Sequence, residues 1–328
     1  MAGQLYLATG NGLFVVERRA DAWHIVRHVL PGTVITSGIA CEGLVLAGTT
    51  EGMLRSDDDG ETWREANAGL TIPHVRWMAR PEQCLAFTLA GTEPASIFVT
   101  HNGGASWIPC PEIEELAQAH GWHLPYSPAA GCVRSFAIHG SGAYDALVYA
   151  AVEVGGVLYS TDSGETWSLI EGSDGNPDVY RPFGTNIHPD VHSIRLHAAA
   201  PHILTAATGG GLYRSTDSGA TWRCLYRCYC RALWVNPADP AHILFGPADG
   251  VNQGGRIEET RDGGETWQPA AQGLDVPWAG RMVERMTTVN DERFAVLSDG
   301  ALLSWDLSSP NWQPMLSEIT DCKSIFVA

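Results

Sequence analysis

Two histidines and an aspartate stand at alternate positions in the segment His188-Pro-Asp190-Val-His192. In extended backbone, residues i, i+2 and i+4 project to one side, so this spacing predicts two imidazoles and a carboxylate side by side. Such a group can bind a divalent metal or carry acid–base chemistry. The structural alternative is that Asp190 orients the imidazoles and braces a long connection, with no ligand.

Four further residues have side chains suited to catalysis or sugar binding. Glu153 and Asp249 are candidates for a general acid or base, with His188 and His192 assisting. Trp122 and Trp278 are candidate aromatic platforms for a sugar ring. Their structural alternative is to anchor loops.

The elements that must position these residues are marked by a repeated motif, Ser-x-Asp-x-Gly-x-Thr-Trp. Full copies start at Ser56, Ser160 and Ser215, and conservative variants start at Thr100 and Thr260. The acid accepts hydrogen bonds within a turn, the glycine supplies a positive φ, and the tryptophan packs the hairpin. These roles are structural, so the residues at the acid position are not catalytic candidates: Asp58, Asn102, Asp162, Asp217 and Asp262.

Counting these motifs predicts the fold. Degenerate copies around Trp23 and Trp312 bring the series to seven hairpins, each flanked by two more strand-like runs. Seven repeats of four strands predict an all-β, seven-bladed propeller of antiparallel blades that spans residues 1–328 as one domain. The chain begins on a second strand, and the C-terminal segment 322–328 resembles the missing first one. We therefore expect that segment to complete blade one and to close the ring.

Loop lengths separate the two ends of such a propeller. The motif turns belong to one short, regular end, and the long insertions 108–131 and 170–192 belong to the other. Long loops are often functional. We expect these two insertions, which flank blade four, to rise over the central mouth. A third loop, 246–255, adds Asp249 at the same end.

A second feature comes from aligning the first strands of the blades on their apolar pattern. Five of the seven residues that start these strands could be cationic, and together they would form a ring around the mouth. Such a ring of positive charge would attract an anionic ligand. The alternative is that each cation pairs with an acid such as Glu153, Asp249, Glu284 or Asp299. The residues that start these strands in the alignment are Thr36, Val75, Arg134, His192, Arg231, Arg285 and Lys323.

Composition narrows the partners and the compartment. The formal net charge of −17 argues against nucleic acid or anionic lipid as a main partner. No apolar run reaches the length of a membrane span, and the N-terminus lacks the pattern of a signal peptide, which favours the cytoplasm. Reduced cysteines are then expected. A zinc site is a weaker alternative for the close group Cys224, Cys228 and Cys230.

These repeats resemble those of the BNR/Asp-box propellers across nearly the whole chain, most closely at Ala206–Trp222. That superfamily includes sialidases, xyloglucan-degrading hydrolases, sortilin-type receptors and photosystem II assembly factors. The sialidase resemblance implies an arginine triad, here Arg134, Arg231 and Arg285, and a tyrosine–glutamate pair, here Tyr180 and Glu153. Sialidases generally have six blades, whereas seven are predicted here. The motifs specify the fold and leave the activity open.

Two functions from different classes follow. The first is a binding module that holds an anionic small molecule, a glycan or a protein partner on its loop-rich face. The second is a glycoside hydrolase or a metal-assisted enzyme that uses the same pocket, with a possible divalent metal at His188, Asp190 and His192.

Overall fold

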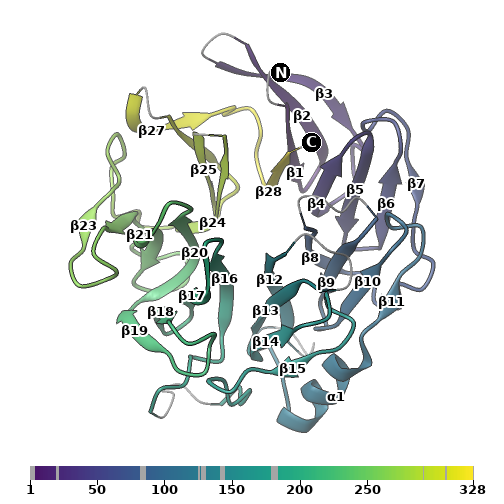
Figure 1. Cartoon of the computed structure of the whole chain (residues 1–328). Helices are drawn as coiled ribbons and strands as arrows, with labels where there is room; N and C mark the ends of the chain where they lie inside the picture. The colour runs from purple at the N-terminus through teal and green to yellow at the C-terminus, as the bar shows by residue number, and fades with distance from the viewer. Residues whose placement is uncertain are drawn as a thin grey trace.

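The computed structural model describes residues 4–19, 22–81, 86–124, 126, 131–140, 145–178, 184–290, 292–306 and 309–327. These residues form seven sheets of four antiparallel strands, arranged radially about a common axis (Figure 1). We number the sheets blades 1 to 7, starting with the sheet that contains the N-terminal strand. The structure confirms the predicted seven-bladed propeller.

Every blade runs from an inner strand beside the axis to an outer strand at the rim. The inner strands are β28 (Cys322–Val327), β4 (Ile35–Cys41), β8 (Val75–Ala79), β12 (Cys132–His139), β16 (Val191–His197), β20 (Tyr229–Asn236) and β24 (Val283–Val289). The second strands are β1 (Gln4–Thr9), β5 (Leu44–Thr49), β9 (Thr88–Thr92), β13 (Leu147–Glu153), β17 (Ala200–Thr208), β21 (Asp239–Ala248) and β25 (Glu292–Leu297).

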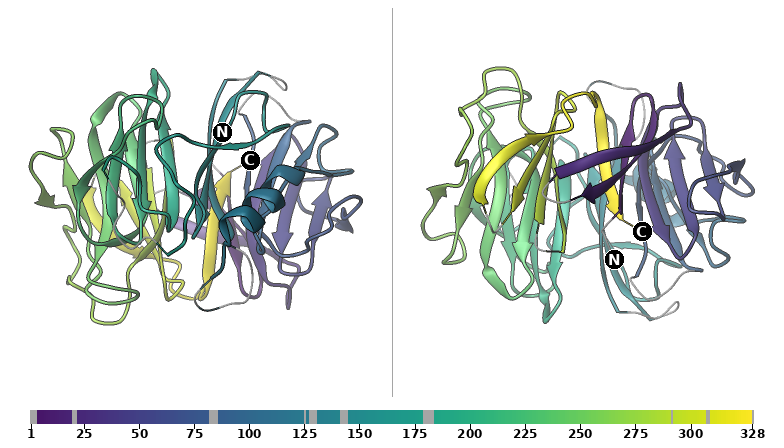
Figure 2. Two further views of the ribbon diagram at one scale, coloured as in Figure 1. Left: turned by 90° about the horizontal axis from the view of Figure 1, so that it is seen from below. Right: turned by 90° about the horizontal axis from the view of Figure 1, so that it is seen from above.

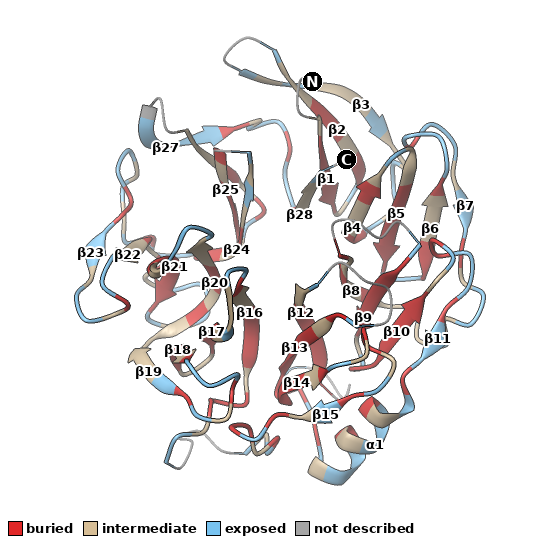
Figure 3. Cartoon of the chain, viewed as in Figure 1, coloured by how far each residue is buried: buried red, intermediate tan, exposed pale blue. Residues whose placement is uncertain are grey.

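The third strands are β2 (Gly12–Arg19), β6 (Met53–Ser56), β10 (Ile97–Thr100), β14 (Gly156–Ser160), β18 (Gly211–Ser215), β22 (Glu258–Thr260) and β26 (Leu302–Asp306). The outer strands are β3 (Ala22–Val29), β7 (Arg64–Glu65), β11 (Ile108–Pro109), β15 (Ser168–Leu169), β19 (Arg223–Tyr226), β23 (Gln268–Pro269) and β27 (Ser309–Met315). Burial is greatest on the second strands and falls toward the rim, where β7, β11 and β23 are exposed (Figure 3).

The two ends of the chain build blade 1 together. Strand β28 pairs antiparallel with β1, which places Leu7 opposite Ile325. Tyr6 stacks on Phe326, with the ring centroids 5.2 Å apart. The C-terminal strand therefore supplies the inner strand of the first blade, as the sequence predicted, and the edge that β1 would otherwise expose is paired.

The repeated motif forms the turn between third and outer strands, as the box of blade 4 shows. Asp162 Oδ1 accepts from the Thr166 N–H (3.0 Å), and its Oδ2 accepts from the Thr166 hydroxyl (2.6 Å). The Gly164 N–H donates to Ser160 Oγ, and Gly164 has a φ of 89°. Trp167 is buried and donates its indole N–H to the Gly164 carbonyl. These side chains all serve the turn, as predicted.

Neighbouring blades approach closely where a second-strand glycine meets a buried valine. A Cβ built on Gly91 would lie 2.4 Å from Cγ1 of Val133, the second residue of the next inner strand. Gly48 meets Val75 and Gly246 meets Val283 in the same manner. The missing side chain lets each valine fill the space between blades, which is where the apolar cores lie.

The two long insertions run along the rim instead of covering the mouth. Helix α1 (Pro111–His120) lies at the outer edge beside β11 and β15 (Figures 1 and 2), where Ile113 and Ala117 pack against blades 3 and 4. The expectation that both insertions rise over the mouth is therefore wrong for most of their described length. The apolar face of α1 is buried against the blades, and this contact holds the helix at the rim. Among the described residues, no helix is long and apolar enough to cross a membrane.

Candidate functional site

Each inner strand pairs through a β-bulge near its start, which leaves one residue without a partner in the ladder in six blades and two in blade 6. A bulge re-aims the side chain of the extra residue, and here six of the seven line one cavity at the loop-rich end of the axis while His192 lines the constriction below it. The bulged residues are Thr36, Arg76, Arg134, His192, Arg231 with Ala232, Glu284 and Lys323.

Five of the seven positions predicted by the strand alignment are bulged residues, and neighbouring residues take the other two places. Val75 is buried between blades, and its neighbour Arg76 takes the bulged place. Arg285 lies one residue beyond the bulge, which is occupied by Glu284. A better signal was present in the sequence, because a buried Ile, Val or Cys directly precedes every bulged residue: Ile35, Val75, Val133, Val191, Cys230, Val283 and Cys322.

The cavity at this end, which we call the mouth, has a volume of about 660 Å³. Its described lining holds five cationic side chains against two carboxylates, in a chain whose formal net charge is −17. The exposed side chains of Tyr126 and Val251 stand on its edge. The mouth is therefore a charged hollow with apolar groups at the rim.

Ion pairs connect the ring across the axis, which supports the pairing alternative for its arginines. Arg134 donates to Glu153 Oε2 (2.9 Å) and to Glu284 Oε1 (2.7 Å), and Arg231 donates to Glu284 Oε2 (2.7 Å). Lys323 pairs with Asp321. Burial alone would raise the pKa of Glu284, but the Arg134 and Arg231 charges outweigh it and hold that pKa at about 2. Blades 4, 6 and 7 are thus joined by one network.

The structure gives Glu153, one of the predicted catalytic acids, little capacity to donate a proton. Burial raises the pKa of Glu153, but the Arg134 charge, with that of His192, brings it below its usual value. Its Oε1 also accepts from the Tyr126 hydroxyl (2.8 Å). The side chain of Asp249 is 71% exposed and pairs with Arg256 at 3.0 Å. Tyr180 lies outside the described residues.

The predicted histidine–aspartate group is partly assembled, with a different third member. Asp190 Oδ1 lies 3.0 Å from His192 Nε2, and Glu153 completes a set of ligand atoms within 4.8 Å of one another. His188 is not in the set, because its Nδ1 accepts from the Asp190 N–H and its ring packs on Gly210. Burial lowers the pKa of His188, which favours the neutral ring. The alternating spacing failed because the backbone turns at Pro189, whose carbonyl accepts from the Val191 N–H.

Both candidate tryptophan platforms are buried. Trp122 donates its indole N–H to the Gly175 carbonyl (2.9 Å) and so joins the two insertions. Trp278 is 7% exposed and lies under the guanidinium of Arg281. In this structure both tryptophans therefore have the loop-anchoring role of the structural alternative.

The cysteines show no sign of a zinc site. All seven described cysteines are free. Within the described part of the chain, the group of ligand atoms close enough for a metal is Glu153, Asp190 and His192, not the trio Cys224, Cys228 and Cys230. Burial raises the pKa of Cys132 to about 11 and that of Cys322 to about 12, so these two are protonated thiols near neutral pH.

Radial four-stranded blades, the turn boxes and closure by the last strand define a seven-bladed β-propeller. A family model described as BNR/Asp-box repeat matches residues 158–169, the box of blade 4. No curated protein matches the chain.

Solved structures share this fold at low sequence identity. YCF48 bound to D1 peptide is 16% identical with a TM-score of 0.61, over 93% of this chain and 90% of that one. YCF48 from Cyanidioschyzon merolae is 15% identical with a TM-score of 0.61, over 94% and 97%. An ancestral GH74 enzyme is 15% identical with a TM-score of 0.60, over 90% of this chain. This chain spans only 38% of the length of that enzyme. Identities this low establish the fold alone.

Proposed function

We propose that the protein is a non-catalytic binding module whose mouth holds a carboxylate-bearing peptide segment of a protein partner. The observation that carries this proposal is the cationic surplus of the mouth lining, with Arg76, Arg231 and Lys323 on three different blades. Exposed Tyr126 and Val251 add apolar contact area at its edge, and a charged centre beside aromatic and aliphatic groups is suited to a protein segment. The fold neighbour YCF48, which has been solved with a bound peptide, supports the same class of partner.

The enzyme alternative receives less support from the electrostatics. A glycosidase needs one carboxylic acid that stays protonated near neutral pH. The acids of the mouth network, Glu153 and Glu284, both have pKa values below their usual range. They are therefore ionised and already paired with arginines.

Fluorescence anisotropy with labelled nonamer peptides tests the binding proposal. A randomised acidic pool should bind the folded protein, and basic and neutral pools should bind at least 10-fold more weakly. Lys323→Glu reverses a charge in the mouth and should weaken the acidic pool by at least 10-fold. Arg223→Glu is the matched control, because Arg223 is also exposed and paired with an acid but lies on the outer strand β19.

Two outcomes count against the proposal: equal affinity for the three pools, or equal effects of the two charge reversals. Turnover of aryl glycosides that is lost on Glu153→Gln would instead establish the enzyme alternative.

A divalent cation at Glu153, Asp190 and His192 is a second candidate function for this end of the axis. It is favoured by one observation, since Asp190 Oδ1 and His192 Nε2 are buried, lie 3.0 Å apart and have no other hydrogen-bond partner among the described residues. Carboxylate oxygens with one imidazole suit Mn²⁺ or Zn²⁺. Titration calorimetry of EDTA-treated protein with each ion should give one site, which Asp190→Ala removes and His188→Gln retains. Heat that persists in Asp190→Ala would count against this site.

A further inference from the structure

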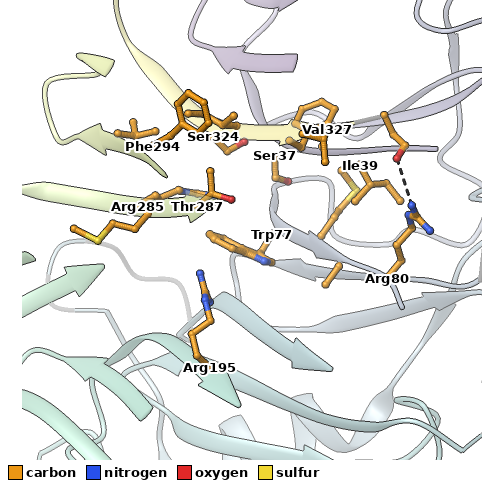
Figure 4. A pocket seen from close by; sticks show the side chains of 18 residues that line it. Ser37, Ile39, Trp77, Arg80, Arg195, Arg285, Thr287, Phe294, Ser324 and Val327 are labelled. Atoms are coloured by element: carbon orange, nitrogen blue, oxygen red, sulfur yellow. Dashed lines mark hydrogen bonds between the residues drawn. The ribbon is translucent and has the colours of Figure 1, made fainter. Parts of the chain in front are cut away.

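A second cavity, of about 320 Å³, opens at the opposite end of the axis from the mouth (Figure 4). Its wall is built from the later parts of the inner strands β4, β8, β24 and β28, together with Arg195 of β16. Ligand cavities of proteins start at about this size. The cavity shares only Arg285 with the mouth, and the two hollows are separated by a constriction at Trp77 and Arg285.

Two guanidinium groups face this cavity without a carboxylate partner. The Cζ atom of Arg285 lies 4.2 Å from the centre of the Trp77 ring, and Arg195 donates to Ser135 Oγ (3.2 Å) and to the Ile194 carbonyl (2.9 Å). Among the described residues, no carboxylate oxygen lies within 4.0 Å of either group. The arginines of the ring differ, because Arg134 and Arg231 are both paired with acids.

Burial makes these two charges costly. It lowers the pKa of Arg195 to about 10, and burial together with the Arg134 charge lowers the pKa of Arg285 to about 9. A guanidinium keeps its proton near neutral pH. The cost is therefore relieved by a counter-anion rather than by loss of the proton.

Two hydroxyl groups of the same cavity also lack partners. Ser37 is 4% exposed and Ser324 is 6% exposed, and neither Oγ makes a hydrogen bond. Buried hydroxyls are normally satisfied. Figure 4 shows both serines on the wall that faces Trp77, where an oxygen-bearing ligand would reach them.

Most of the remaining lining is apolar, with Arg80 and Thr287 as further polar residues. Carbon side chains from four blades surround the polar groups: Ile39, Met78, Met286, Phe294, Ile325 and Phe326. A ligand that fills this space needs a hydrocarbon body as well as an anionic group.

We propose that this cavity is a second ligand site, which binds a small organic carboxylate with an apolar body. The carboxylate accepts hydrogen bonds from Arg195 and Arg285 and from the two serine hydroxyls. The body packs against the aromatic and aliphatic wall that β25 and β28 supply. This site is independent of the partner proposed for the mouth.

Titration calorimetry at pH 7 with 4-phenylbutyrate, octanoate and the matched alcohol 4-phenylbutanol tests the proposal. At least one acid should bind the wild-type protein at 1:1 stoichiometry, and 4-phenylbutanol should bind at least 20-fold more weakly than 4-phenylbutyrate. Arg195→Met keeps an unbranched side chain, removes the guanidinium with its charge and should weaken the acid at least 10-fold. Thr287→Trp keeps both arginines, fills the cavity from its wall and should abolish binding.

Lys323→Glu, which alters the mouth alone, should leave the affinity for the carboxylates unchanged. The proposal is overturned if the folded wild-type protein binds neither acid, or if acid and alcohol bind equally. It is also overturned if Thr287→Trp retains binding that Lys323→Glu loses, because the carboxylate then sits in the mouth and the proposed peptide site still stands. Circular dichroism of each unliganded variant separates loss of binding from loss of folding.

Discussion

Arg134 joins blade 4 to blade 7 across the axis, through Glu153 on one side and Glu284 on the other. Its side chain is 10% exposed, so both carboxylates depend on it for charge compensation. Removing one partner of a buried pair leaves an uncompensated charge, which costs far more than the pair itself contributes.

Arg134→Ala should therefore lower the free energy of unfolding by about 3–5 kcal/mol. Urea denaturation followed by tryptophan fluorescence measures this loss. Arg223→Ala breaks an exposed pair with Glu265 and should cost less than about 1 kcal/mol. Comparable losses in the free energy of unfolding for Arg134→Ala and Arg223→Ala would contradict the burial of the Arg134 network.

The low pKa of Glu284 makes stability depend on acidity. A carboxylate whose pKa is lower in the folded than in the unfolded chain stabilises the fold above the unfolded value, and this contribution is lost as the pH falls. For Glu284 the loss should occur between about pH 4.5 and pH 2. Thermal unfolding across this range should show a decline that is shallower in Glu284→Gln, and parallel curves for the two proteins would contradict it.

The ring shows how far residue-level prediction reached. Arg134, His192, Arg231 and Lys323 were found because the alignment of the inner strands on their apolar pattern places these residues at the strand start. Arg76 was missed because a bulge shifts the facing of side chains by one position, and hydrophobic periodicity alone does not reveal a bulge. Glu153 lies beside Asp190 because two neighbouring blades are in contact, and the local sequence does not encode that contact.

At the scale of the element, the turn box is the unit that the sequence specifies most completely. The motif residues of blade 4 form hydrogen bonds within the turn that contains them: Ser160, Asp162, Gly164 and Trp167. The motif alone therefore predicts the structure of the turn. Helix α1 lies within the insertion 108–131, whose place at the rim was not predicted. That place depends on which surface accepts Ile113 and Ala117.

Asp162→Ala should destabilise the protein by about 1–2 kcal/mol, because three hydrogen bonds of the turn are lost. Asp162→Asn should cost clearly less. Blade 3 provides the precedent, since Asn102 accepts from the Ser106 N–H (2.9 Å) and donates to the Ser106 hydroxyl. Melting temperatures from calorimetry compare the two variants, and equal losses would mean that the charge rather than the hydrogen bonds matters.

At the scale of the whole molecule, the seven blades followed from counting repeats, and their closure followed from the resemblance of segment 322–328 to an inner strand. The repeat fixes the number of sheets, and the orphan strand segment at the C-terminus can pair only where a strand is missing. The two ends of the axis differ in a way that counting does not predict. One end holds a network of paired charges, and the other holds Arg195 and Arg285, which pair with no carboxylate among the described residues, in a largely apolar wall.

Removal of residues 322–328 should open the ring between blades 1 and 7. The deletion exposes the edge of β1 and the apolar residues beneath Ile325, so the melting temperature should fall by 10 °C or more if the chain still folds. A synthetic peptide of residues 320–328 added in trans should recover part of this loss. An unchanged melting temperature after the deletion would show that the last strand does not close the fold.

The bulges have a practical consequence for engineering. Their side chains line the axis while the backbone on either side keeps its ladder, so the bulged residues outside the buried Arg134 network, such as Thr36 and Lys323, can be exchanged while the sheets stay as they are. A combinatorial library restricted to these positions would vary what the scaffold recognises without redesigning any blade. The same separation offers evolution a route to new specificities by a handful of point mutations.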